Sequence, residues 1–213
     1  MNFAICDAEQ RSPEWFAARA GRATGSRASD ILAKIKSGEA AARRDYRMQL
    51  AIERITGKPL DDGGFVSKDM QRGIDCEPLA LAAYEADTGN IVERTGFLIA
   101  PDVMAGCSLD GSVDNFAGII EVKCPKTATH AGYLRSRTIP ADYMAQITHN
   151  LWVSEAAWCD FVSFDDRMPE GLQYLRIRVE RASVNMKAYE DALLAFLAEV
   201  DAEVDALLAL RAA

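Results

Sequence analysis

The sequence lacks any apolar run long enough to cross a membrane. A transmembrane helix needs about 20 consecutive apolar residues. Charged residues make up 26% of the 213-residue chain and interrupt its hydrophobic stretches before that length is reached. Residues 1–10 also lack the basic and apolar segments of a secretory signal. We therefore expect a cytoplasmic protein with no membrane partner.

Cysteine is present, but not in the patterns that bind zinc or build a disulfide framework. The five cysteines are odd in number and widely spaced, and no two of them form a CxxC pair. We expect reduced thiols. The two histidines, His130 and His149, are not expected to bind a metal, and His149 is expected to be satisfied by hydrogen bonds.

Basic residues are outnumbered, since 24 Lys and Arg stand against 32 Asp and Glu, for a net charge of -8. A negative protein repels a polyanion at long range. The charges are unevenly distributed, however: residues 19–47 hold eight basic and three acidic side chains, whereas residues 181–213 hold three basic and six acidic ones. We expect a basic N-terminal face that can follow phosphates, with the acidic remainder facing away, and binding that weakens steeply with salt.

The length suits one domain, and the periodicity changes along the chain from that of helices to that of strands. A glycine-rich turn is expected at 61–64, and Pro78 predicts a bend or restart in its helix. The apolar stripe of the last helix fits the core better than a subunit contact. The class is mixed α/β, with a central strand-turn-strand unit flanked by helices. Helices are expected at about 12–19, 29–33, 41–56, 67–88, 141–153 and 185–210, and strands within 91–123 and at 158–164 and 173–179.

Charged residues interrupt a strand that otherwise has a buried pattern. Side chains alternate between the two faces of a strand, so Glu121 and Lys123 share one face. If residues 114–118 form a hairpin loop, pairing about its centre sets Asp110 opposite Val122, within one residue of both charges. Three ionisable groups are therefore expected to converge.

Such a group has a chemical use. Two carboxylates brought close together repel each other, and their pKa values rise unless a cation lies between them. Oxygen ligands of this kind suit Mg²⁺ or Mn²⁺. An adjacent lysine can then orient a water nucleophile or stabilise the charge that builds on phosphorus. The alternative is an edge hairpin whose Glu and Lys form a surface ion pair that contributes about 0–1 kcal/mol.

The same residues resemble a known pattern. Asp110 with Glu121, Val122 and Lys123 is similar to the D-(x)n-E-x-K core of the PD-(D/E)xK nuclease superfamily. Over about 15–171 the chain also resembles the lambda exonuclease and YqaJ-like viral recombinase family in six ordered blocks. The blocks are 14–19 (EWFAAR), 24–26 (TGS), 73–77 (GIDCE), 107–111 (CSLDG), 121–125 (EVKCP) and 143–146 (YMAQ).

The resemblance implies a fold and an organisation. The fold would be the restriction-endonuclease-like α/β fold of the PD-(D/E)xK enzymes, with a central mixed β-sheet flanked by helices. Residues 1–213 would form one nuclease domain. Its parts would be an N-terminal helical DNA-end-binding part at about 12–60, a catalytic core at about 67–180 and a C-terminal helix at about 185–210.

The implied activity is that of a Mg²⁺-dependent 5'-to-3' exonuclease, with Mn²⁺ as an alternative ion. It would degrade one strand of double-stranded DNA from an end to 5'-mononucleotides and leave a 3' single-stranded overhang for homologous recombination. The resemblance also implies a ring-shaped homotrimer, a single-strand annealing protein as partner, and a phage or prophage origin in a bacterial cytoplasm. The alternatives are a site- or structure-specific endonuclease of the same superfamily and a non-catalytic DNA-end-binding module.

Residue roles also follow from the resemblance. Metal ligands would be Asp110, Glu121 and the Val122 carbonyl, with Glu77 supporting a second ion. Lys123 would activate the attacking water, with Gln146 beside it. Arg19 and Ser26 would hold the 5'-phosphate, and the chemistry of these two residues supports this independently, because a guanidinium binds phosphate with two hydrogen bonds and Ser26 precedes a helix start.

Two departures from the superfamily matter. Relatives with a Q-x-x-x-Y helix carry tyrosine four residues after the glutamine, whereas this chain has Asn150 at that position. The contacts that the tyrosine makes in those relatives are therefore not carried over to this chain. Relatives with an iron-sulfur cluster need a C-terminal group of cysteines. Only Cys159 follows Cys124 here, and we expect no cluster.

Overall fold

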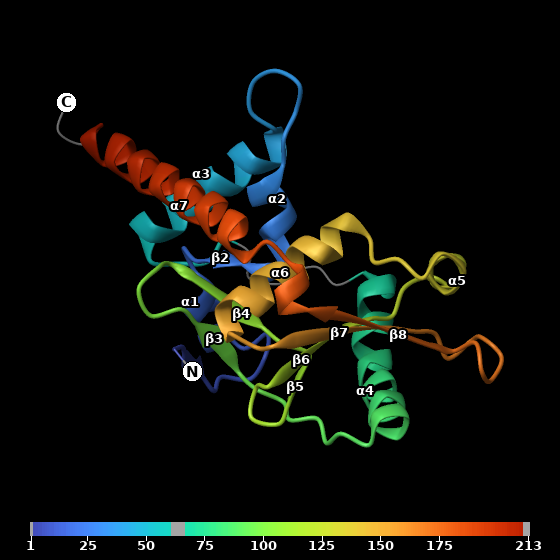
Figure 1. Cartoon of the computed structure of the whole chain (residues 1–213). Helices are drawn as coiled ribbons and strands as arrows, with labels where there is room; N and C mark the ends of the chain where they lie inside the picture. Colours follow the sequence, from blue (N-terminus) through green and yellow to red (C-terminus); the bar gives the residue numbers. More distant parts are fainter. Residues whose placement is uncertain (1, 61–66, 211–213) are drawn as a thin grey trace.

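The computed structural model describes residues 2–60 and 67–210 (Figure 1). The glycine-rich turn expected at 61–64 lies outside the described residues. In the described ranges, every helix is too short or too polar to span a bilayer.

All six predicted helices are present, and each begins and ends within one residue of its predicted bounds. The first half contains β1 (Ala4–Cys6), α1 (Pro13–Arg19), β2 (Ala23–Thr24), η1 (Gly25–Arg27), α2 (Ala28–Leu32), α3 (Ala41–Thr56) and α4 (Lys68–Thr88). The second half contains β3 (Phe97–Ile99), β4 (Ala105–Ser108), β5 (Gly111–Val113), β6 (Gly118–Lys123), α5 (Thr127–Ser136), α6 (Ala141–Ser154), β7 (Trp158–Phe164), β8 (Tyr174–Glu180), η2 (Arg181–Ser183) and α7 (Met186–Ala209).

Local signals explain where these helices begin and end. Ser12 caps α1 by accepting a hydrogen bond from the Trp15 N–H at 3.2 Å. Ser67 caps α4 in the same way. Gly57 follows α3 with φ 66°, the left-handed conformation that glycine adopts without strain.

The structure differs from the predicted elements in three places. Of the bend or restart predicted at Pro78, the restart is excluded, since α4 is continuous there; an interior proline removes only one helical hydrogen bond and the rest of the helix is held by packing. Helix α5 was not predicted; of its residues only His130 is buried, so it carries little apolar periodicity. The strand expected from residue 91 is reduced to β3 and an isolated bridge between Glu93 and Ser112.

The strands form two four-stranded mixed sheets, in the orders β1-β3-β4-β2 and β5-β6-β7-β8. In the second sheet β5 and β6 are antiparallel, β6 and β7 parallel, and β7 and β8 antiparallel. This is the mixed α/β arrangement expected from the sequence, with the strands divided between two sheets.

The hairpin register differs from the predicted one by one residue. Gly111 pairs with Ile120 and Val113 with Gly118, so continuing the ladder brings Asp110 opposite Glu121 and not Val122. The reason is the loop, which holds four residues, 114–117, instead of five. It closes with a hydrogen bond from the Ala117 N–H to the Asp114 carbonyl at 3.1 Å.

Helices cover both faces of the second sheet. Ile120 and Val122 of β6 pack against α4, where Leu81 and Tyr84 are buried. Ile119, on the opposite face, packs with Ile147 and Leu151 of α6. Glu121 shares the face of Ile119 and is therefore directed toward α6.

Helices α3 and α7 form a separate layer and lie side by side (Figure 1). Most of the apolar stripe of α7 packs in the core, as the sequence suggested, but Leu194 and Leu208 are exposed. Its buried members are Leu193, Phe196, Leu197 and Val200, which cluster with Tyr46 and Leu50 of α3.

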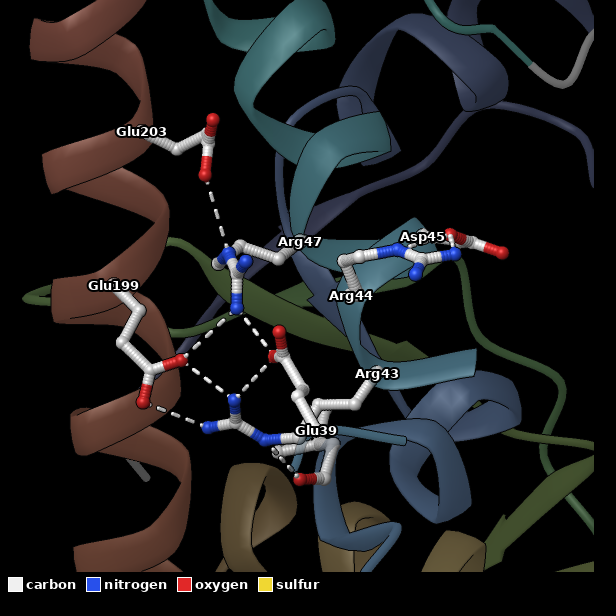
Figure 2. Close-up of polar contacts among 8 residues, drawn as sticks. Glu39, Arg43, Arg44, Asp45, Arg47, Glu199 and Glu203 are labelled. Carbon is white, nitrogen blue, oxygen red and sulfur yellow. Dashed lines mark hydrogen bonds and ion pairs between the residues drawn. The ribbon is translucent and has the colours of Figure 1, made fainter. Parts of the chain in front are cut away.

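The predicted separation of basic and acidic surfaces was wrong. Arg43 of α3 donates two hydrogen bonds to Glu199 of α7, at 2.6 and 2.9 Å. Arg47 contacts Glu199 and Glu203, and both arginines contact Glu39 (Figure 2). Apolar packing of the two helices brings their charged edges together, so the acidic helix neutralises the basic one.

Candidate active site

All eight site residues predicted from the sequence line one cleft with a volume of about 630 Å³. They come from five helices or strands and one loop that are distant in sequence. They are Arg19 of α1, Ser26 of η1, Glu77 of α4, Asp110 of the β4–β5 loop, Glu121, Val122 and Lys123 of β6, and Gln146 of α6.

The basic side chains of the cleft come from residues 11–167 and not from the N-terminal part alone. The cleft can therefore attract a polyanion although the net charge of the protein is negative. Among the residues that the structure describes, six basic and four acidic ones line the cleft. Arg43, Arg44 and Arg47, which sequence reasoning assigned to a phosphate-binding face, are not among them. The basic lining is Arg11, Arg19, Arg72, Lys123, Lys126 and Arg167, and the acidic lining is Asp69, Glu77, Asp110 and Glu121.

Asp110, Glu121 and Lys123 converge at the floor of the cleft. The Val122 N–H donates a hydrogen bond to Asp110 Oδ2 at 2.6 Å. Lys123 Nζ donates to Glu121 Oε1. Glu121 is only 1% exposed, so this carboxylate depends on protein groups and not on bulk water for its hydrogen bonds.

The pKa values of these groups reflect a buried excess of negative charge. Burial raises the pKa of Glu121 to about 7; the charge of Asp110 adds to the rise and Lys123 opposes it. Burial likewise raises the pKa of Asp110. For Lys123, burial lowers the pKa, but the charges of Glu121 and Asp110 outweigh it and the net shift is upward. The single positive charge of Lys123 does not balance the negative charges of Asp110 and Glu121. A bound cation would reduce the remaining repulsion between these carboxylates.

The donor set consists of oxygens. Within residues 2–60 and 67–210, no three His, Cys, Asp or Glu side chains lie close enough together to form a metal site by themselves. Asp110 and Glu121 supply two carboxylates, and Val122 lies in the same cleft with its backbone carbonyl as a third oxygen. Two carboxylates with further oxygens from backbone, water and substrate phosphate fit Mg²⁺ or Mn²⁺.

Glu77 and Gln146 border this group from opposite helices. Glu77 of α4 forms an ion pair with Arg94 at 3.2 Å. Burial raises the pKa of Glu77 and the charge of Asp110 raises it further. Gln146 lines the cleft from α6.

Arg19 lines the same cleft and is held there by three neighbouring side chains. Its guanidinium lies 4.1 Å from the centre of the Trp15 ring and 5.4 Å from that of Phe97, and it donates to Ser108 Oγ at 3.4 Å. The Trp15 indole N–H donates to the same oxygen at 3.1 Å. Ser26 also lines the cleft, so a group of donors suited to a phosphate shares the cleft with the carboxylates.

Sequence reasoning missed four residues of the site. Trp15 and Ser108 hold Arg19, as described above. Tyr143 lies under the Lys123 ammonium, 5.0 Å from its ring centre. Asn150 donates to Glu121 Oε2 at 3.0 Å. Tyr143 and Asn150 could have been found from helical spacing, because residues 143, 146 and 150 fall on one face of a helix.

The two histidines are structural. His149 is buried, with Nδ1 bonded to the Tyr189 hydroxyl at 2.6 Å and Nε2 to the Gly106 carbonyl at 2.9 Å. His130 bonds to Ser163 and to the Leu172 carbonyl. As expected, His149 has its hydrogen bonds satisfied.

The chain is similar to known proteins in sequence and in fold. The family model of the YqaJ-like viral recombinase domain matches residues 14–157. A crystal structure of LHK-Exo in complex with dAMP is 38% identical over 94% of this chain and 98% of that one, with a TM-score of 0.85. The alkaline exonuclease LHK-Exo from Laribacter hongkongensis is 37% identical with the same coverage and a TM-score of 0.83.

A more distant likeness concerns the fold alone. The phage related exonuclease from Haemophilus somnus 129PT is 15% identical, with a TM-score of 0.68 over 87% of this chain and 96% of that one. The search of curated proteins found no match.

Proposed function

The chain belongs to the YqaJ-like viral recombinase family, and from this premise we propose that it is a Mg²⁺-dependent 5'-to-3' exonuclease acting on double-stranded DNA ends. Family membership and 38% identity to LHK-Exo support a nuclease role in recombination. The observation that carries the finer proposal is the convergence of Asp110 and Lys123 on the buried Glu121, in one cleft with Arg19 and Ser26.

The residues present fit the ion. Asp110, Glu121 and the Val122 carbonyl would hold one Mg²⁺, and Glu77 would support a second after releasing Arg94. Mn²⁺ would satisfy the same oxygens. When bound, the ion supplies Lewis-acid activation of the phosphodiester and of water.

Lys123 positions the nucleophile in this proposal. Its ammonium is held by Glu121 and lies over the Tyr143 ring. From there it can donate a hydrogen bond to the attacking water or to a phosphate oxygen on which charge builds. Gln146, on the same face of α6 as Tyr143, would orient that water with its amide.

Arg19, Ser26 and Ser108 would bind the terminal 5'-phosphate. Arg19 supplies charge-assisted donors and the two serines supply hydroxyls. Holding a 5' end in the same cleft as the carboxylates would place the first phosphodiester at the site of hydrolysis. Release of 5'-mononucleotides would leave a 3' overhang for an annealing protein, and that LHK-Exo has been crystallised with dAMP supports such a product.

We extend the proposal to assembly and setting. The enzyme would work as a ring-shaped homotrimer that encloses DNA, in the cytoplasm of a bacterial host and from a phage or prophage. Light scattering after size exclusion would give the number of copies directly, and a monomer at working concentration would rule out the ring.

The function is tested on linear duplex DNA labelled separately at each 5' end, with a covalently closed circle and an EDTA control. Loss of the linear duplex as 5'-mononucleotides, with the circle intact, is expected. A cut circle would indicate an endonuclease. No hydrolysis of either substrate with Mg²⁺ or Mn²⁺ would indicate a DNA-end-binding module.

A further inference from the structure

Asn150 makes a buried contact with Glu121, a residue of the cleft, and the proposed function gives this contact no role. It lies on α6, one turn after Gln146, and is 1% exposed. Its Nδ2 donates to Glu121 Oε2 at 3.0 Å, while Lys123 Nζ donates to Oε1. Each oxygen of the Glu121 carboxylate therefore has a donor from a different element, and together the two donors fix the rotation of the carboxylate.

The other end of the amide has an unusual environment. Asn150 Oδ1 is buried and has no hydrogen-bond partner among the described residues. It lies against Gly25, since a Cβ built on Gly25 would come within 2.2 Å of this oxygen. Gly25 begins the turn that carries Ser26. The amide thus spans the space between the Glu121 carboxylate and the turn assigned to the 5'-phosphate.

The unpaired oxygen shows which interaction determines the orientation of the amide. A flipped amide would set Oδ1 against Glu121 Oε2, and two acceptors repel each other. A buried unpaired acceptor is itself unfavourable. The observed orientation therefore keeps the donor to Glu121 at the cost of leaving Oδ1 without a partner.

We propose that Asn150 is a positioning residue that orients the Glu121 carboxylate for cation binding. This inference rests on the proposed function, which assigns a divalent cation to Glu121. Removing a group that hydrogen-bonds to a metal ligand typically lowers metal affinity or activity about 10–100-fold.

The test measures Mn²⁺ binding without DNA, from the electron paramagnetic resonance signal of the free ion. Asn150→Ala and Asn150→Leu both remove the donor, and leucine keeps a branched side chain of similar size. The matched control is Ser154→Ala. Ser154 is also 1% exposed on α6, and its hydroxyl donates to the Asn150 carbonyl at 2.7 Å without touching Glu121.

Both Asn150 variants should bind Mn²⁺ about 10–100-fold more weakly than the wild type, and Ser154→Ala should bind normally. In hydrolysis, kcat should fall while KM for DNA stays unchanged. Normal Mn²⁺ affinity of Asn150→Leu, or an equal loss in Ser154→Ala, would overturn the proposal in favour of packing. Wild-type protein whose Mn²⁺ binding is insensitive to Glu121→Gln would instead overturn the metal assignment in the proposed function.

Discussion

Asp110 and Val122 are joined by a hydrogen bond of 2.6 Å, from the Val122 N–H to Asp110 Oδ2. Asp110 lies just before β5, and the bond holds its carboxylate against β6, the strand that carries Glu121 and Lys123. Because the donor is a backbone group, the position of Asp110 is set by the ladder and not by a flexible side chain.

Lys123→Ala should abolish hydrolysis and leave DNA binding nearly intact. The ammonium acts on the reacting water and phosphate, so its removal should lower kcat by about 10²–10³-fold or more. Single-turnover hydrolysis and a filter-binding assay would separate the two effects. Lys187→Ala is the control, because Lys187 is an exposed lysine on α7. Normal cutting by the Lys123 variant would show that the site is wrongly assigned.

Arg19→Ala should weaken the preference for a 5'-phosphorylated end more than it weakens chemistry. A hydrogen bond to a charged group contributes about 1.5–3 kcal/mol, so the ratio of rates on 5'-phosphate and 5'-hydroxyl ends should fall by about 10–100-fold. Arg44→Ala, which removes an exposed arginine paired with Asp45, should keep the wild-type ratio. An unchanged ratio in the Arg19 variant would place the 5'-phosphate elsewhere.

Glu199→Gln should destabilise the fold without altering DNA affinity. The substitution removes the charged acceptor shared by Arg43 and Arg47, and we expect a loss of about 1 kcal/mol in the free energy of unfolding at low salt. Urea unfolding and DNA binding at matched ionic strength would measure both quantities. Asp191→Asn, on the exposed Lys187 pair, is the control. Tighter DNA binding by Glu199→Gln would mean that the arginines of α3 do reach the nucleic acid.

His149 should make the protein sensitive to acid. Burial lowers its pKa from 6.5 to about 4, so the folded protein keeps this ring neutral while the unfolded chain protonates it. Its contribution is fully present above about pH 6.5 and is lost as the pH falls toward 4, at up to about 1.4 kcal/mol per pH unit. Nitrogen-detected NMR should show a neutral imidazole at pH 5.5. A ring that titrates near pH 6.5 would contradict the prediction.

Gly25→Ala should be destabilising, and Asn150→Ala should relieve much of that cost. The added Cβ would lie 2.2 Å from Asn150 Oδ1, whereas its next neighbour from another residue, His149 Cδ2, is at 3.5 Å. Overpacking of this kind costs about 1–3 kcal/mol. A double-mutant cycle by urea unfolding should give a coupling energy between the two sites, and additive effects would contradict the predicted contact.

Local patterns were sufficient for much of the fold. Helix α3 was predicted at the boundaries observed, because its spacing is helical and Gly57 ends it. Glu121 and Lys123 were predicted to share a face because strand alternation does not depend on the rest of the chain. Helix α5 was missed for the opposite reason, since little of it faces the core.

What the sequence by itself determined is the family, the mixed α/β class and eight of the residues that line the cleft. Only the tertiary structure decided which charges meet. Arg43 and Glu199 are separated by 156 residues, and the packing of two apolar stripes, not their charge, brings them together. The loop length likewise set Asp110 opposite Glu121, and the approach of α6 to β6 placed Asn150 on that carboxylate. Residue type and spacing act over one turn or one strand, whereas contacts between elements follow from how the whole core packs.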